Sequence, residues 1–83
     1  MYFAKNLSVI GYANGFTLWH YRSTDSVSDV LAGGHFDEAA DMLRVADLVF
    51  ANLDTEGAAQ NGILTVCRST DGEVVVAQPG FSL

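Results

Sequence analysis

The fold of this chain is decided by the stretch Gly15-Phe-Thr-Leu-Trp-His-Tyr-Arg-Ser-Thr-Asp25 and by the run Gly34-His-Phe-Asp-Glu-Ala-Ala-Asp-Met-Leu-Arg44. Residues Phe16–Arg22 are rich in aromatic and β-branched side chains, which favour a strand. Because alternate residues of a strand point to opposite faces, one face carries Phe16, Leu18, His20 and Arg22, and the other carries Thr17, Trp19 and Tyr21. Both faces hold large apolar groups. We therefore expect this strand to be covered on both sides, one of them by a neighbouring protein.

The segment after this strand is dense in residues that cap helices. Ser26 and Asp29 have the spacing of a capping box, which predicts a helical turn over Val27–Leu31 that ends at the glycine pair following it. Asp37 is placed to cap a second short helix over residues 38–45. The buried side of that helix would be formed by residues spaced i, i+3, i+4 and i+7, namely Phe36, Ala39, Ala40 and Leu43.

Three further strands are expected in the second half of the chain. They are predicted at Leu48–Leu53, Gly62–Ser69 and Glu73–Gln78. The tripeptide Thr70-Asp-Gly72 between the last two is a hairpin signal. The run Val74-Val-Val76 is entirely apolar, so we expect the last strand to be covered on both faces or to lie in an interface.

The N-terminal residues are apolar but lack a regular alternation. We interpret residues 1–14 as an arm with one short strand near Leu7–Ile10, which packs across its own sheet or reaches a neighbour. Residues 15–83 then form the β-rich core of a single domain, 1–83. The predicted fold class is α+β and β-rich. It is a small antiparallel barrel or sandwich of four or five strands, with one or two short helices inserted after the first main strand.

The length and composition of the chain favour a protein that is stabilised by association with other subunits. Its 83 residues form one domain, and a domain of this size is marginally stable alone. The single cysteine excludes an internal disulfide, and two histidines with one cysteine argue against a closed zinc site. Charged residues make up 17% of the chain, against about 25% in typical domains. Oligomerisation, or docking on a larger surface, is the remaining source of stability.

The charge of the chain excludes some partners. The net charge is −6, and the four basic residues are spread along the sequence. Because phosphate contacts need clustered lysine and arginine, we expect no nucleic-acid partner and no binding to anionic membranes. The N-terminus lacks the basic start and apolar core of a signal peptide, and no apolar run approaches the roughly 20 residues that span a bilayer. We expect a soluble protein that is made inside the cell, with no membrane partner.

No constellation of reactive side chains predicts catalysis. Cys67 lies inside a predicted strand, where a buried, inert cysteine is the usual case. His20 is expected to be a packed, hydrogen-bonded imidazole, and His35 a partly exposed loop residue. Helix capping and a solvated surface account for the acidic cluster of Asp37, Glu38 and Asp41. We therefore expect no enzymatic activity, no cofactor and no metal site.

The aromatic residues offer a different role. Tyrosine and tryptophan dominate the binding energy of many protein interfaces, and this chain concentrates them near its N-terminus. The residues that we assign to a partner or oligomer interface are Tyr2, Phe3, Leu7, Ile10, Tyr12, Phe16, Trp19, Tyr21 and Phe81.

The run Phe16-Thr-Leu-Trp-His-Tyr-Arg-Ser-Thr-Asp25, the run from Gly34 to Arg44, and Asp47-Leu48 together resemble a family of very small proteins of tailed bacteriophages, the head decoration (capsid cement) proteins. The resemblance covers roughly residues 15–50. It implies a virion protein on the outer surface of the capsid, a homotrimer at three-fold positions that binds the major capsid protein. One departure is Ala46, where a glycine would allow a tight turn from helix to strand.

Two other functions remain open at this point. The first is a structural module of the phage tail or of fibre attachment. The second is a small oligomeric enzyme or ligand-binding domain built from His20, Cys67 and the carboxylates.

Overall fold

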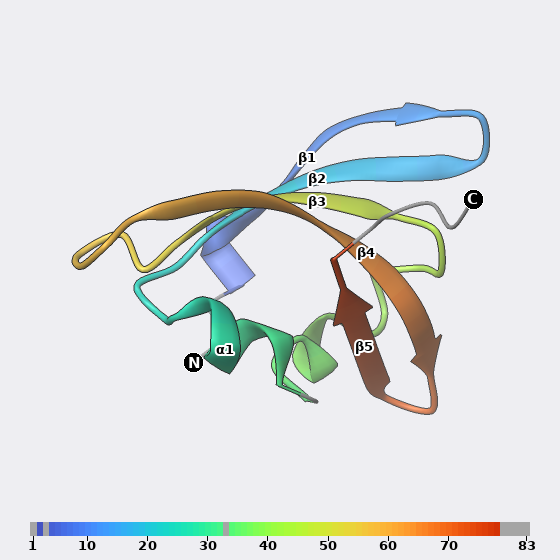
Figure 1. Ribbon diagram of the computed structural model, residues 1–83. Coiled ribbons are helices and arrows are strands. Elements are labelled where there is room, and N and C mark those ends of the chain that lie inside the picture. The colour runs from blue at the N-terminus through green and yellow to red at the C-terminus, as the bar shows by residue number, and fades with distance from the viewer. Residues whose placement is uncertain (1, 3, 33, 79–83) are drawn as a thin grey trace, which may run out of the picture.

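Five strands form a single sheet in the order β1-β2-β3-β4-β5 in the computed structural model, which describes residue 2 and residues 4–32 and 34–78. The elements are a 3₁₀ turn η1 (Ala4–Asn6), β1 (Leu7–Ala13), β2 (Phe16–Arg22), α1 (Val27–Leu31), a 3₁₀ turn η2 (Asp37–Ala39), β3 (Leu48–Leu53), β4 (Gln60–Thr70) and β5 (Glu73–Ala77). Figure 1 shows the sheet as a curved layer. The crossover segment, residues 23–47, carries α1 and η2 and lies against the concave face of the sheet.

The β-rich prediction is confirmed, and several elements lie where the sequence places them. Strands β2 and β3 and helix α1 have the predicted bounds. The Ser26 hydroxyl accepts a hydrogen bond from the Asp29 backbone N–H at 3.2 Å, as a capping residue does. Asp71 and Gly72 both have positive φ, 53° and 77°, which suits the tight hairpin turn predicted between β4 and β5.

The prediction that all strands are antiparallel is wrong for one pair. Strand β2 pairs with β3 in parallel, with Leu18 opposite Leu48 and Arg22 opposite Asn52, while the other pairs are antiparallel. The reason is the crossover segment, because it passes over the concave face and returns the chain to the end at which β2 began. The sheet is mixed and its order ends at β1 and β5, so a barrel or sandwich is not confirmed.

The N-terminal residues form part of the sheet where an arm was expected. Residues Leu7–Ala13 pair along β2 through a hairpin whose turn is Asn14-Gly15, with φ of 50° and 86°. The short strand predicted near Leu7–Ile10 is the first part of β1. The regular alternation of the longer strand is interrupted by a β-bulge, which leaves Ile10 without a partner between Val9 and Gly11. The boundary predicted at residue 14 therefore falls inside a hairpin and separates no arm from a core.

The predicted second helix is also shorter than expected. Only Asp37–Ala39 form a 3₁₀ turn, and Phe36 precedes it without a side-chain cap. The Asp37 carboxylate accepts the Val74 backbone N–H of β5 at 2.9 Å instead. The apolar stripe keeps its predicted role, because Phe36, Ala39 and Leu43 are buried.

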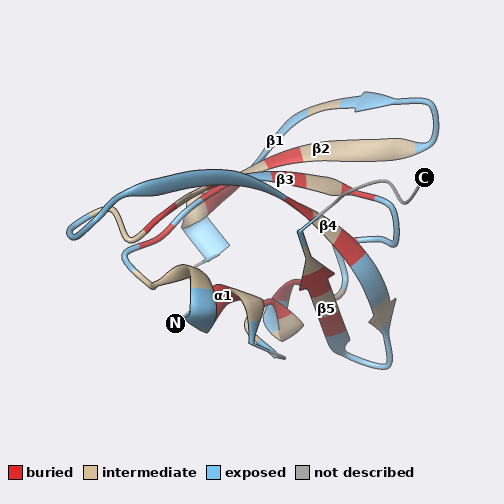
Figure 2. Ribbon diagram, viewed as in Figure 1, coloured by how far each residue is buried: buried red, intermediate tan, exposed pale blue. Residues whose placement is uncertain are grey.

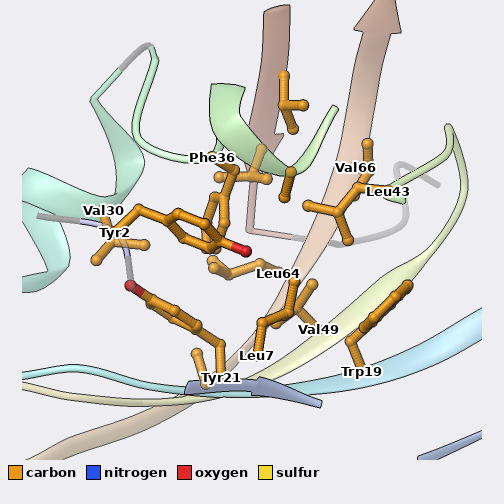
Figure 3. Close-up of a cluster of buried hydrophobic side chains, with 14 of the residues drawn as sticks. Tyr2, Leu7, Trp19, Tyr21, Val30, Phe36, Leu43, Val49, Leu64 and Val66 are labelled. Carbon is orange, nitrogen blue, oxygen red and sulfur yellow. The ribbon is translucent and has the colours of Figure 1, made fainter. Parts of the chain in front are cut away.

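The core lies between the concave face and the crossover segment. Figure 2 shows the buried residues gathered there, with the outer part of β1 and the first half of β4 exposed. In Figure 3, Trp19 and Tyr21 point from the sheet toward Phe36 and Leu43. The Tyr21 ring packs edge-on against Phe36 with centroids 5.0 Å apart, and it stacks on Tyr2 at 5.8 Å. One aromatic cluster thus joins the N-terminus, β2 and the crossover segment.

Candidate functional site: an interaction surface

The one buried carboxylate of the described residues holds the fold together. Asp47, 2% exposed, ends the crossover segment immediately before β3. Its Oδ1 accepts the Thr17 backbone N–H at 3.0 Å, and its Oδ2 accepts Trp19 Nε1–H at 3.0 Å and the Arg44 backbone N–H at 3.1 Å. Three donors therefore share one carboxylate, which accounts for its burial.

The turn that delivers Asp47 to this position is strained at Ala46. The φ of Ala46 is 80°, in the left-handed region that favours glycine. The Ala46 N–H donates to the Val66 carbonyl at 3.0 Å, and the Val66 N–H donates to the Asp47 carbonyl at 3.0 Å. These two hydrogen bonds to β4 hold the turn in place. Ala46, the position at which the sequence departs from the family it resembles, is therefore the residue with the strained backbone.

The convex face of the sheet is apolar and open. Strand registers place Leu18, Leu48, Phe50 and Ile63 on this face, away from the crossover segment. Phe50 is 40% exposed and Ile63 is 43% exposed, while Leu18 and Leu48 are half-buried. On β2, β3 and β4 this face carries no carboxylate. Such a patch on an acidic chain is typical of a surface that contacts another molecule.

A shallow groove of about 450 Å³ lies on the convex face. It is lined by His20, Phe50, Ala51, Asn52, Asn61, Gly62 and Ile63. The Asn52 amide Nδ2–H donates to His20 Nε2 at 2.8 Å, which occupies the imidazole as the sequence predicts. This groove therefore has an apolar floor and one polar edge. Because His20 Nε2 accepts the bond from Asn52, that nitrogen is not available to activate a nucleophile.

A second groove, of about 610 Å³, lies beside the β1–β2 hairpin. It is lined by Tyr12, Ala13, Asn14, Gly15, Phe16, Thr17, Trp19, Met42, Arg44 and Asp47. Tyr12 is 81% exposed and Met42 is 44% exposed, so the rim offers large apolar side chains together with the Arg44 cation. The Asp47 carboxylate at its floor is already engaged by three donors.

Tyr21 and His35 form a hydrogen-bonded pair of titratable rings in the aromatic cluster. The Tyr21 hydroxyl and His35 Nε2 are 3.1 Å apart. Burial lowers the pKa of His35, an effect that the carboxylates of Asp25 and Asp29 partly oppose. Neither ring lines the grooves described above. The pair therefore contributes packing and a hydrogen bond to the cluster, outside both grooves.

The structure divides the residues predicted for an interface. Tyr2, Leu7, Trp19 and Tyr21 are buried in the core and offer no surface to a partner. Ile10 and Tyr12 are exposed, and Phe16 is half-buried. Phe3 and Phe81 lie outside the described residues. The prediction for the buried four is corrected, because the crossover segment of the same chain already covers them.

The reactive residues are dispersed. Cys67 is exposed, contrary to expectation, because Leu64 and Val66 face the core and the next residue along β4 faces away from it. It lies in a bulge and has no partner residue on β5. Glu38 and Asp41 are exposed on the crossover segment. Within the described residues, no three histidine, cysteine or acidic side chains gather as a metal site would require. No helix in that part of the chain has the length and apolarity to cross a bilayer.

Two features of the structure were not predicted from the sequence. Phe50 and Ile63 were not singled out, although the apolar run Leu48–Leu53 indicates a strand with two apolar faces. The role of Asp47 was also missed. A buried tryptophan needs an acceptor for its N–H, and that rule could have prompted a search for a carboxylate near Trp19.

Comparison of the chain with protein-family models, with curated proteins and with solved structures found no match. The geometry and the sequence pattern therefore carry the functional argument.

Proposed function

We propose that the chain is a structural virion protein, a capsid decoration protein that binds the major capsid protein and stabilises the head of a tailed bacteriophage. The observation that carries the proposal is the open convex face, where Phe50 and Ile63 stand exposed without a carboxylate among the neighbouring strand positions. The resemblance of residues 15–50 to head decoration proteins names the partner.

The physical basis of stabilisation is the burial of apolar surface between subunits. Each Å² of apolar surface removed from water contributes roughly 25 cal/mol. A decoration protein that covers the junction of several shell subunits adds this term to contacts that resist the pressure of packaged DNA. Copies would gather as trimers at three-fold positions on the outer surface of the head. The sandwich predicted from the sequence would be completed when a partner covers the convex face.

The positions of the titratable groups favour a structural function over an enzymatic one. Asp47 and Asp37 each accept backbone N–H groups that hold the crossover segment to the sheet. His20 and His35 each hydrogen-bond to a neighbouring side chain. These four groups, which a small enzyme would need, are occupied in building the fold. The proposal includes no catalytic activity and no cofactor.

Binding to heads tests the proposal. Purified protein is mixed with expanded heads that lack it, and bound protein is measured by co-sedimentation. We expect saturable binding and heads that withstand a higher temperature before rupture. Phe50→Lys should weaken binding by tenfold or more, because the lysine charge would be desolvated on the convex face. Val45→Lys changes an exposed apolar residue elsewhere and should bind as the wild type does.

Two results would contradict the capsid role. The first is absence of binding to heads at micromolar protein. The second is labelled protein found on tails or fibres only, which would indicate the tail module.

A further inference from the structure

The dipeptide asparagine–glycine occurs twice in the chain, in two structural settings. Asn14-Gly15 forms the turn between β1 and β2, and Asn61-Gly62 lies inside β4. Asparagine is one of the thermally labile residues of proteins, and a glycine that follows it carries no Cβ to shield its backbone nitrogen. The two dipeptides therefore offer the same reaction in two places, and the fold can distinguish between them.

The Asn14-Gly15 turn leaves the reacting groups open to solvent. Both residues are exposed, and Figure 2 shows the tip of the β1–β2 hairpin in pale blue. In the part of the chain that the structure describes, neither the Asn14 side-chain amide nor the Gly15 backbone N–H makes a hydrogen bond. Apart from the chain neighbours of Gly15, no heavy atom of the described residues lies within 4 Å of the position that a Cβ would occupy there. Water and the Asn14 side chain can therefore both reach the Gly15 nitrogen.

Asn61 and Gly62 are also exposed, but a neighbouring strand restrains their backbone. Asn61 lies opposite Asn52, and Gly62 lies opposite Ala51, in the antiparallel pairing of β4 with β3. A ring can close between a side chain and the next backbone nitrogen only if the chain rotates about the bonds between them. Inside a paired strand that rotation requires the ladder to open locally, whereas a hairpin tip opens more easily.

We propose that Asn14 is a site of spontaneous modification, at which the side-chain amide is converted to a carboxylate while Asn61 is preserved. Hydroxide removes the proton of the Gly15 N–H, and the nitrogen attacks Asn14 Cγ. The new C–N bond closes a succinimide ring, and the side-chain nitrogen leaves with a proton as ammonia. Water then opens the ring. Cleavage of the bond from nitrogen to Cγ gives aspartate, and cleavage of the bond from nitrogen to the backbone carbonyl carbon gives isoaspartate.

The two products should affect the hairpin differently. Aspartate suits such a turn, because Asp71-Gly72 forms the β4–β5 turn with φ of 53° and 77°, close to the 50° and 86° of Asn14-Gly15. Isoaspartate adds a carbon atom to the main chain, which a two-residue turn that pairs Ala13 with Phe16 cannot absorb without a change of register.

Both products add a negative charge to the groove that Asn14 lines together with Arg44. As the protein ages, this groove should therefore become more acidic, and in the isoaspartate form β1 should be less firmly paired. Neither a capsid nor the convex face is involved, so this site goes beyond the proposed function and the two can fail independently.

The stability of the Asn14→Asp variant tests the structural consequence. This variant carries the new charge on an unaltered main chain and should unfold in urea as the wild type does. The isoaspartate form, separated from aged protein by ion exchange, has the same charge and should be less stable than Asn14→Asp. Equal stability of these two forms would contradict the predicted change of register.

The rate of amide loss at each site tests the modification itself. The purified wild-type protein is incubated at mildly alkaline pH, and peptide mass spectrometry follows residues 14 and 61 with time, in buffer and in urea. In the native protein, residue 14 should react about tenfold faster than residue 61 or more, and in urea the two rates should be similar. The native rate at residue 14 should also rise with pH. Equal native rates at the two sites, or an Asn14 that reacts in urea and not in the native protein, would overturn the proposal.

Discussion

The crossover segment is attached to the sheet by two aspartates, Asp37 near its middle and Asp47 at its end, and the two attachments differ in depth. Asp47 is buried and accepts three N–H groups, two of them from β2. Asp37 is half-buried and accepts one N–H, from Val74 of β5. From this difference we infer what determines the loss of stability when each carboxylate is removed. It should depend on the number of N–H donors left without an acceptor, more than on the charge that is lost.

The largest expected effect is at the deeper attachment. Asp47→Ala would leave the N–H groups of Thr17, Trp19 and Arg44 without their acceptor in a buried site. We expect the free energy of unfolding to fall by about 3–5 kcal/mol, a large part of a small domain's stability. Urea denaturation followed by Trp19 fluorescence measures this loss.

Asp47→Asn is the matched control for that variant. It keeps one acceptor oxygen, so it should lose less stability than the alanine variant. A loss below about 1 kcal/mol in Asp47→Ala would show that water replaces the carboxylate, and the comparison between the two attachments would fail.

The shallower attachment should cost less to remove. Asp37→Ala would leave only the Val74 N–H unsatisfied at a half-buried position, so we expect a loss of about 1–2 kcal/mol. Asp41→Ala removes an exposed carboxylate from the same segment and should change stability by less than about 0.5 kcal/mol. Parallel urea curves for both variants provide the measurement. Equal losses at residues 37 and 41 would show that the bond to β5 contributes nothing.

The turn before Asp47 can be relaxed without touching either attachment. Ala46 has a φ of 80°, where alanine is strained and glycine is not. We expect Ala46→Gly to raise the free energy of unfolding by about 0.5–1 kcal/mol, despite the entropy that glycine adds to the unfolded chain. Ala32→Gly, at an exposed residue with φ of −63°, is the control and should not stabilise. A destabilised Ala46→Gly variant would mean that the turn is not strained.

These residues also show how much of the fold can be predicted from the sequence. Local signals were enough for β2, α1, β3 and the Asp71-Gly72 turn, because composition and capping within a few residues determine them. The parallel pairing of β2 with β3, and the attachment of Asp37 to β5, depend on contacts between residues at least 30 positions apart in the sequence. A helix pattern over residues 38–45 was overridden by these tertiary contacts.

The interface prediction failed for a related reason. Trp19 and Tyr21 have the composition of interface residues, but aromatic side chains serve a core equally well. Only the position of the crossover segment decides between these roles. Among the described residues, the large apolar side chains of the sheet that remain exposed are Val9, Ile10, Tyr12, Phe50 and Ile63.

The smallest expected effect is the pH dependence contributed by His35, which lies on the same crossover segment shortly before Asp37. Burial lowers its pKa below the ordinary value of 6.5, so between these two pH values the unfolded chain binds more protons than the folded one. The free energy of unfolding should therefore fall as pH drops below about 6.5, and this contribution levels off below the folded pKa. His35→Gln should flatten the part of the pH dependence that lies between about pH 7.5 and pH 5.5. Because the variant changes the hydrogen bond between the Tyr21 hydroxyl and residue 35, the quantity compared is the change of stability with pH and not the absolute stability. If the wild type and His35→Gln lose the same stability over that interval, the imidazole is as solvated in the fold as in the unfolded chain, and the crossover segment does not shield it.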